Sequence, residues 1–408
     1  MKTVLIVGKK FSSLTEYLSS HGMEYVFLQD VRTTKFPDKK FKRRVLADFS
    51  TKETILEAVD KLKIPPDAVV ATYEDYILPT AWIAEHLGLP GLPVAAAEAC
   101  TDKYIMRSMF REAPEKISPD FIEVGNEAEL VEFARNHSFP LILKPANLSK
   151  SLLVTKSRDM EELVGNYRRT MDNIERVYKK YAPNRKPKLV LEEFLEGSIH
   201  SVDAFVDKEG MSHVMEQIVD YQTGYDIGYD DNFHYSRILP SKLSPEAQVD
   251  FLHCAEIGCR ALGMRNSPAH IEIIVTKDGP RIVEIGARNG GYRERMHWLA
   301  NGIDITGNML RLAFGDKPKI IATKNESIAV LELFPKTPGF FAGIKNEEEL
   351  RSLLSLNYLS IKTKIGDFIG KSSDGYKMAV VVILHNSDSK QFLRDLDFVN
   401  NSVEVATS

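Results

Sequence analysis

The first part of the chain alternates short apolar runs with helical patterns, and this feature constrains the fold most strongly. Such alternation is typical of a small parallel sheet with helices on both faces. The sequence Leu89-Pro90-Gly91-Leu92-Pro93 ends the pattern, so we place a domain boundary at residue 93. The predicted strands are residues 4–7, 25–28 and 68–71, and the predicted helices are residues 14–20, 51–62 and 77–87.

The remaining sequence predicts a large mixed unit and a smaller one. The large unit has helical patterns at residues 94–109 and 158–181, with apolar strands between and after them. Beyond residue 325, two apolar strands and a helix are typical of a small α+β domain. The expected fold class is α/β and α+β, in three units that span residues 1–93, 94–325 and 326–408.

Composition excludes several classes of function. The chain has 408 residues, with 53 Lys plus Arg and 57 Asp plus Glu, for a formal net charge of -4. This balance offers no basic surface for nucleic acid or for an anionic membrane. No stretch approaches the roughly 18 uncharged apolar residues of a membrane span, and the 3 cysteines cannot form a disulfide framework. We expect a soluble cytoplasmic protein that acts on small molecules.

Two glutamates lie in a predicted hairpin around the turn sequence Lys277-Asp278-Gly279-Pro280. A three-residue loop would place Glu272 directly opposite Glu284. Paired carboxylates on an apolar hairpin repel each other unless a cation lies between them. Mg²⁺ takes one or two protein carboxylates together with substrate phosphates. The pair therefore predicts a metal site, with two solvated glutamates on an exposed strand as the alternative.

The segment after Glu284 carries groups suited to an anion. The planar fork of Arg288 can hold a phosphoryl group by two hydrogen bonds. Gly290 and Gly291 allow backbone N–H groups to come close to an anion. A glycine-rich turn before a surface helix is the alternative reading of the glycines.

Two lysines and a strand end complete the set of candidates. Lys144 ends an apolar strand, where solvation is poor, so we expect it to face a phosphate. Lys103 follows Asp102 near a helix start and could equally be a surface residue. Glu192 lies where a buried strand passes into a turn, and its carboxylate could accept from the exocyclic amine of a purine. An ordinary strand end with solvated acidic residues is the alternative there.

Taken in order, these motifs resemble the ATP-grasp superfamily over about residues 1–325. The tail sequence Leu331-Glu332-Leu333-Phe334-Pro335-Lys336-Thr337-Pro338-Gly339, and Gly366-Asp367 before Tyr376, are similar to the C-terminal domain of bacterial L-amino-acid ligases. The resemblance implies a Rossmann-like N-terminal domain (1–93), a two-lobed ATP-grasp domain (94–325) and a C-terminal domain of amino-acid-ligase type (326–408).

The resemblance also implies roles for the matched residues, with ATP and Mg²⁺ as cofactors and Mn²⁺ able to substitute. Arg288 would stabilise an acyl phosphate and the tetrahedral intermediate. The phosphates of ATP would be held by Lys103 and Lys144, adenine by Glu192, Glu193 and Leu195, Mg²⁺ by Glu272 and Glu284, and the substrate carboxylate by Gly290, Gly291, Tyr292, Arg293 and Arg295.

The sequence departs from the superfamily pattern at three places. The loop after Lys144 lacks the usual glycines, and the hydroxyls of Ser149 and Ser151 would take their role. His200 is the candidate replacement for the glutamate that usually binds ribose, with a histidine that only packs in the core as the alternative. Gly286 stands where many relatives have an asparagine metal ligand, which amino-acid ligases also lack.

The function that this resemblance implies is an ATP-dependent ligase that joins a carboxylate to an amine through an acyl phosphate. An amino acid is the expected substrate, and a homodimer is possible. Residues 220–234 would close over the substrate, and Asp220, His234 and His297 are candidate bases. An ATP-grasp carboxylase or purine-pathway ligase is one alternative, and a non-catalytic ATP-binding regulatory module is another.

Overall fold

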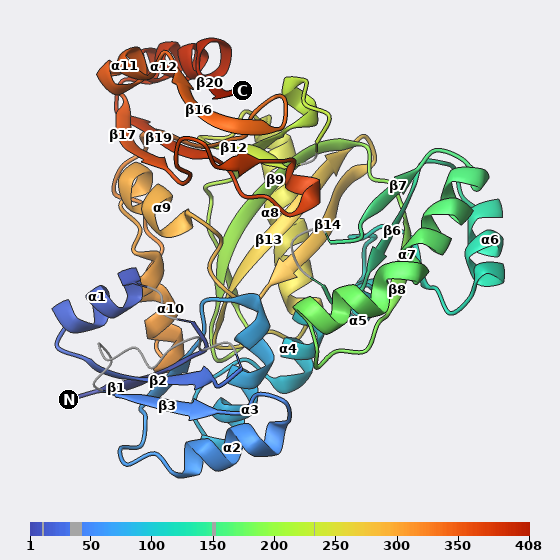
Figure 1. Ribbon diagram of the computed structural model, residues 1–408. Coiled ribbons are helices and arrows are strands. Elements are labelled where there is room, and N and C mark those ends of the chain that lie inside the picture. The colour runs from blue at the N-terminus through green and yellow to red at the C-terminus, as the bar shows by residue number, and fades with distance from the viewer. Residues whose placement is uncertain (10–11, 33–42, 149–151, 232) are drawn as a thin grey trace.

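The computed structural model describes residues 1–9, 12–32, 43–148, 152–231 and 233–408. Figure 1 shows the N-terminal domain at the bottom, a small lobe at the right, and the C-terminal segment at the top of a large central sheet. Within the described residues, no helix combines the length and apolar character needed to cross a membrane.

The N-terminal domain is the predicted parallel sheet, with strand order β3-β2-β1-β4. Its edge strand β3 was not predicted; its three apolar residues, Val45 to Ala47, follow a run of basic residues and are mostly half-buried or exposed. The domain contains strands β1 (Thr3–Val7), β2 (Glu24–Asp30), β3 (Arg44–Ala47) and β4 (Ala68–Val70), and helices α1 (Ser12–Ser20), α2 (Lys52–Asp60), η1 (Glu74–Tyr76) and α3 (Ile77–Leu87).

The helix predicted at residues 94–109 is divided into α4 (Val94–Thr101) and α5 (Lys103–Arg111). Asp102 has an extended backbone, and its carboxylate accepts hydrogen bonds from the backbone N–H groups of Tyr104 and Ile105. An aspartate in this position caps the following helix and ends the preceding one. Lys103 is therefore the first residue of α5, and its backbone N donates to the Ala146 carbonyl at 2.7 Å.

The small lobe is an antiparallel sheet with strand order β5-β8-β6-β7, packed under two helices. Leu141, Leu143 and Leu191 from the sheet and Leu130 and Leu163 from the helices form its core. The long helix predicted at residues 158–181 is α7. The lobe contains β5 (Phe121–Glu123), α6 (Glu127–Arg135), β6 (Leu141–Pro145), β7 (Thr155–Ser157), α7 (Met160–Tyr181) and β8 (Leu189–Glu193).

The central sheet has strand order β14-β13-β9-β11-β12-β15-β19-β17, with β10 paired to β9. Strands from the C-terminal segment thus extend the sheet that carries the predicted site, and no break between sheets occurs at residue 325. Its elements are β9 (Gly197–Val206), β10 (Ser212–Val214), β11 (Val219–Thr223), η2 (Tyr225–Ile227), β12 (His234–Leu239), α8 (Pro245–Ala261), β13 (Ser267–Thr276), β14 (Gly279–Gly286), α9 (Arg293–Asn301), α10 (Ile305–Ala313), β15 (Ser327–Leu333), β17 (Leu356–Ile361) and β19 (Val380–Asn386).

A second, smaller layer completes the C-terminal segment. Here β18, β16 and β20 pair into a short sheet, and α12 packs against β19 and β15. The α+β character predicted for this segment is confirmed. The layer contains β16 (Gly339–Lys345), α11 (Glu347–Ser352), β18 (Phe368–Ile369), η3 (Ser372–Asp374), α12 (Ser389–Ser402) and β20 (Glu404–Thr407).

The hairpin of β13 and β14 places Glu272 opposite Glu284, as predicted, but with a different turn. Thr276 pairs with Gly279, so the turn holds two residues and not three. A bulge after Glu272, which leaves Val283 without a paired residue, restores the predicted register. Bulges are common next to active sites, where they redirect a side chain.

Candidate active site

Each of the two hairpin glutamates lies beside a basic side chain. Lys103 Nζ is 3.1 Å from Glu284 Oε2, and His270 Nε2 is 3.6 Å from Glu272 Oε1. Burial by itself would raise the pKa of Glu272, but His270 and His234 outweigh it and hold that pKa well below its usual range. Glu272 is therefore ionised at any ordinary pH, as a metal ligand must be.

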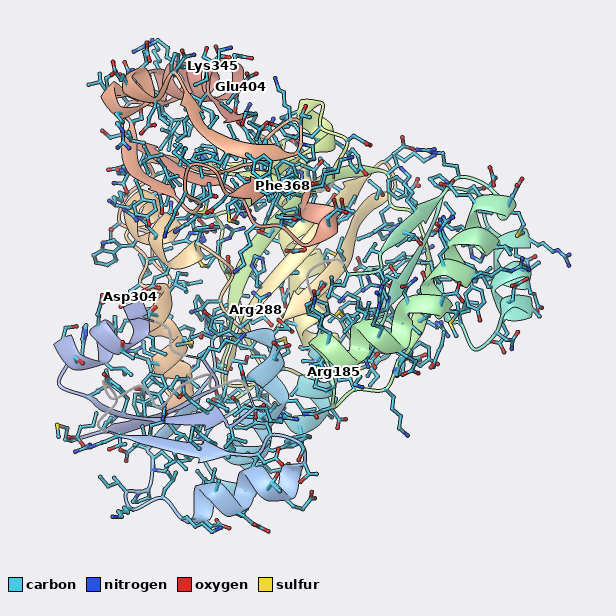
Figure 2. The ribbon with its side chains drawn as sticks, in the orientation of Figure 1. Arg185, Arg288, Asp304, Lys345, Phe368 and Glu404 are labelled. Atoms are coloured by element: carbon cyan, nitrogen blue, oxygen red, sulfur yellow. The ribbon has the colours of Figure 1, made fainter. Side chains whose placement is uncertain are left out.

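Arg288 points toward the N-terminal domain, where it meets a glutamate that the sequence did not single out. Figure 2 shows Arg288 where this domain approaches the hairpin. Its Nε donates to Glu74 Oε2 at 2.8 Å. Burial raises the pKa of Glu74, with Arg288 opposing the shift. The one sequence signal for Glu74 is its place just after β4, since ligands bind at the carboxyl ends of parallel strands.

A buried ion cluster lies in the small lobe beside these groups. Lys144 Nζ is 2.6 Å from Glu192 Oε2, and Arg107 Nε is 3.2 Å from Glu192 Oε1. Burial lowers the pKa of Lys144 to about 8, although Glu192 opposes this. Burial favours the neutral form of Glu192, but Arg107 and Lys144 outweigh it and lower its pKa. Arg107 was not predicted, although it lies one helical turn after Lys103 on α5.

The charged groups at the hairpin, at Arg288 and around Lys144 could together hold a metal nucleotide. The described residues contain no group of three or more His, Cys, Asp or Glu side chains arranged to hold a metal ion. Two carboxylates fit Mg²⁺ that is shared with phosphates, since this ion keeps several ligands from substrate and water. Lys103 and Lys144 supply cations on the small-lobe side of the same region.

Residues 137–294 match the family model of the ATP-grasp domain. The chain carries an ATP-grasp domain. It is 29% identical over 254 residues to alanine–anticapsin ligase of Bacillus subtilis (strain 168), covering 59% of this chain and 52% of that relative. It is also 23% identical over 313 residues to carnosine synthase 1 of Mus musculus, covering 71% of this chain and 34% of the relative. The alignment with the ligase spans about half of that relative's length.

Solved structures share the whole fold. An L-amino acid ligase from Bacillus licheniformis superposes with a TM-score of 0.79 at 21% identity and covers 100% of this chain and 99% of that one. A phosphoribosylglycinamide synthetase from Anaerococcus prevotii gives a TM-score of 0.71 at 18% identity, with 100% of both chains covered. The expected ATP-grasp fold is thus confirmed.

The predicted adenine residues lie at the end of β8 and in the connection from β8 to the central sheet. Glu192 and Glu193 end β8 in the small lobe, and Leu195 precedes β9 in the central sheet. Glu192 forms ion pairs with Lys144 and Arg107, so its side chain stabilises the lobe. Glu193 Oε1 accepts from the Asp120 backbone N at 3.1 Å. These side chains leave the backbone of the connection as the part that could face a purine.

His200 lies on the other face of the central sheet from Glu272. In the pairing of β9 with β13, Glu272 is opposite Ser201, and His200 is opposite Ile273. Because side chains alternate between faces along a strand, His200 points away from the hairpin carboxylates. Its Nδ1 is 2.8 Å from Asp220 Oδ1, and its ring packs against Phe251 of α8. The structure does not bring His200 to the ATP-grasp site, and Ser149 and Ser151 lie outside the described residues.

The predicted substrate residues differ in the contacts that each makes within the protein. A side chain at Gly291 would meet open space, and Tyr292 donates through its hydroxyl to Glu332 Oε1 at 2.7 Å. Arg293 is fully buried and donates to Ser201 Oγ and Tyr221 Oη. The remaining two are Gly290, whose backbone N donates to Asp203, and Arg295, which donates to Asn357 Oδ1. Arg293 and Arg295, which the sequence had assigned to substrate, therefore each have at least one hydrogen-bond partner within the protein.

The three candidate bases differ in their surroundings. Burial lowers the pKa of His234, with Glu272 opposing, so the imidazole is neutral near pH 7. Asp220 accepts from His200, Ser241 and the Lys242 backbone, which leaves it poorly suited to take a proton. His297 is fully buried beside Asn301.

The predicted lid is attached to the C-terminal segment. The carboxylate of Asp231 accepts from the backbone N–H groups of Ser372 and Ser373, and Lys371 Nζ is 2.9 Å from Asp230 Oδ2. The connection between β11 and β12 is thus held against η3. Its closure over a substrate stays a prediction.

A cleft lies between the N-terminal domain, α4, α5 and the end of α7. Arg185 at its margin donates to the Asn147 carbonyl at 2.6 Å, which holds the start of the loop after β6. The lining side chains that carry charge are Glu74, Asp75, Lys103, Arg185 and Glu284.

Proposed function

We propose that this chain is an ATP- and Mg²⁺-dependent ligase that joins a carboxylate to an amine through an acyl phosphate, with an amino acid as a substrate. One observation carries the proposal: Glu272 and Glu284 face each other on the hairpin, and Lys103 lies 3.1 Å from Glu284. Arg288 lies in the segment that directly follows β14. This set can hold a metal nucleotide on one side and an anionic reaction centre on the other.

The lysines provide the charge that phosphoryl transfer needs. Mg²⁺, when bound, neutralises the phosphates and the charge that develops on them. Lys103 pairs with Glu284 in the ligand-free chain, and its ammonium group can turn to phosphate once Glu284 serves as a metal ligand. Lys144 is fixed by Glu192 at 2.6 Å, so its position costs little reorganisation during the reaction.

Arg288 acts on the acyl group. A guanidinium presents a planar pair of donors that fits a phosphate or a tetrahedral oxyanion. Glu74 orients this guanidinium from the N-terminal domain through the hydrogen bond at Nε. His234, neutral near pH 7, is the proposed acceptor of the proton from the attacking amine.

An amino acid is the proposed substrate because two independent comparisons point to that chemistry. One relative is named alanine–anticapsin ligase, and the L-amino acid ligase has a higher TM-score, 0.79, than the purine-pathway synthetase, 0.71. A carboxylase or purine-pathway reaction is the second candidate, supported by the complete coverage of that synthetase.

The test is a screen of amino-acid pairs for ADP formation, with the product detected by mass spectrometry. We expect ADP release that requires Mg²⁺ and both substrates, and a product with the mass of the two amino acids less one water. Bicarbonate and aminoimidazole or phosphoribosylamine substrates test the second candidate. Nucleotide binding with no acceleration of ATP hydrolysis by any mixture would reject the ligase function and favour a regulatory ATP-binding module.

A further inference from the structure

A buried carboxylate on the strand next to the hairpin joins several parts of the site. Asp203 lies on β9 opposite His270 of β13 and is buried. Its Oδ1 accepts from His270 Nδ1 at 3.0 Å and from the Gly290 backbone N at 3.2 Å. Its Oδ2 is 3.3 Å from Arg293 Nε. None of these contacts reaches solvent, and the proposed reaction does not use Asp203 directly.

The contacts of Asp203 lead to both halves of the site. The second ring nitrogen of His270 faces Glu272, at 3.6 Å from Oε1. The ring also packs against Gly290, because a Cβ at Gly290 would collide with His270 Nδ1 and lie 2.7 Å from Arg293 Cγ. A proposed metal ligand and the backbone at Gly290 are therefore both fixed through one carboxylate.

Such a cluster is a costly way to stabilise a fold. Burying ions requires full compensation, and well-packed apolar residues often serve stability as well or better. Groups that hydrogen-bond to metal ligands orient them, and their loss typically weakens metal binding by about 10- to 100-fold. The position of the cluster, next to Glu272 on the same face of the sheet, matches this second use.

We propose that Asp203 is a positioning residue that holds Glu272, through the His270 ring, and the Gly290 backbone in one fixed arrangement for the metal nucleotide. Its consequence for catalysis rests on the proposed ligase function, whereas its consequence for metal binding does not. The two can therefore be measured separately.

The end of the same strand offers a matched control. Asp207 is also buried and directly follows β9, and its Oδ2 is 2.9 Å from His213 Nε2. It too accepts from backbone N–H groups, those of Glu209 and Met211. The Asp207–His213 pair resembles the Asp203–His270 pair in bonding, although the His213 side chain is 24% exposed and that of His270 is 7% exposed. It includes none of the predicted site residues.

The experiment measures Mn²⁺ binding by electron paramagnetic resonance, in the full chain, with a non-hydrolysable ATP analogue present. Asp203→Asn should weaken Mn²⁺ binding by about 10- to 100-fold, whereas Asp207→Asn should leave it within about twofold of the wild type. His270→Gln provides a second variant that keeps Asp203 paired with Arg293 and should weaken Mn²⁺ binding as well.

Three results would overturn the positioning role: unchanged Mn²⁺ affinity in a folded Asp203→Asn or His270→Gln variant, equal loss in Asp207→Asn, or unfolding of both site variants where Asp207→Asn folds. Absence of Mn²⁺ binding by the wild type would overturn the metal site as well. If the variants lose Mn²⁺ affinity but the wild type forms no ADP with any substrate pair, the ligase function fails and the positioning role stands.

Discussion

Replacing Glu192 by glutamine should destabilise the small lobe strongly and make the chain depend on nucleotide for stability. Glu192 is the shared anion of Lys144, at 2.6 Å, and Arg107, at 3.2 Å, and all three side chains are less than a tenth exposed. Removing one partner of a buried ionic cluster typically costs about 3–5 kcal/mol, because the remaining charges stay buried without compensation. We expect a loss of that size for Glu192→Gln.

The neighbouring residue provides the control for this experiment. Glu193 is 3.4 Å from Lys116, but 29% and 50% of these side chains are exposed. Surface pairs of this kind contribute about 0–1 kcal/mol, so Glu193→Gln should change stability little. The two variants make the same chemical change at adjacent positions of β8 and differ in burial and partners.

Urea unfolding followed by fluorescence and circular dichroism, with and without an ATP analogue, measures the difference. Nucleotide should stabilise Glu192→Gln more than it stabilises the wild type, because phosphates would compensate Lys144. Equal destabilisation by the two substitutions would refute the reasoning. So would equal stabilisation of variant and wild type by nucleotide, since Lys144 would then not face the phosphates.

Three further predictions concern the reaction and the effect of Lys144 on stability. Glu284→Gln should abolish ADP formation while leaving the melting curve unchanged, and normal turnover would remove Glu284 from the metal site. Arg288→Lys should lower kcat by about 100-fold or more, the scale seen when a donor to a developing oxyanion is lost; a retained kcat would make Arg288 structural. Since the pKa of Lys144 is depressed to about 8, its buried charge should reduce stability below pH 8, and stability should rise as the pH increases from about 8 toward the unfolded value near 10.4. Ligand-free wild type should show this rise in urea titrations and Lys144→Met should not.

Local patterns predicted the elements that lie close together in the sequence. The hairpin register at Glu272 and Glu284 followed from two strands joined by a strong turn. The turn length was wrong, since the bulge at Val283 has no sequence signal of its own. The division between α4 and α5 was missed because a helix can accommodate an aspartate at position 102. Only the structure shows that the Asp102 carboxylate caps α5.

Contacts between distant segments could not be predicted from one sequence. Glu74 and Arg288 are separated by 214 positions, and the sequence around neither residue predicts their contact. The face of His200 depends on the register of β9 against β13, and a shift by one residue would reverse it. Asp203 was missed for the same reason, because only the paired strands bring it to His270.

The continuity of the central sheet into the C-terminal segment limits how the chain can be divided. Ser236 to Leu239 on β12 pair with Ile328 to Leu331 on β15, which in turn pairs with β19. A chain cut after residue 325 would expose the edge of β12, with open hydrogen-bonding groups that invite aggregation. The segment that resembles amino-acid ligases therefore cannot be exchanged between relatives as a separate module. Chimeras would have to exchange β12, β15, β17 and β19 together, so any specificity carried by this segment would change with the sheet that supports it.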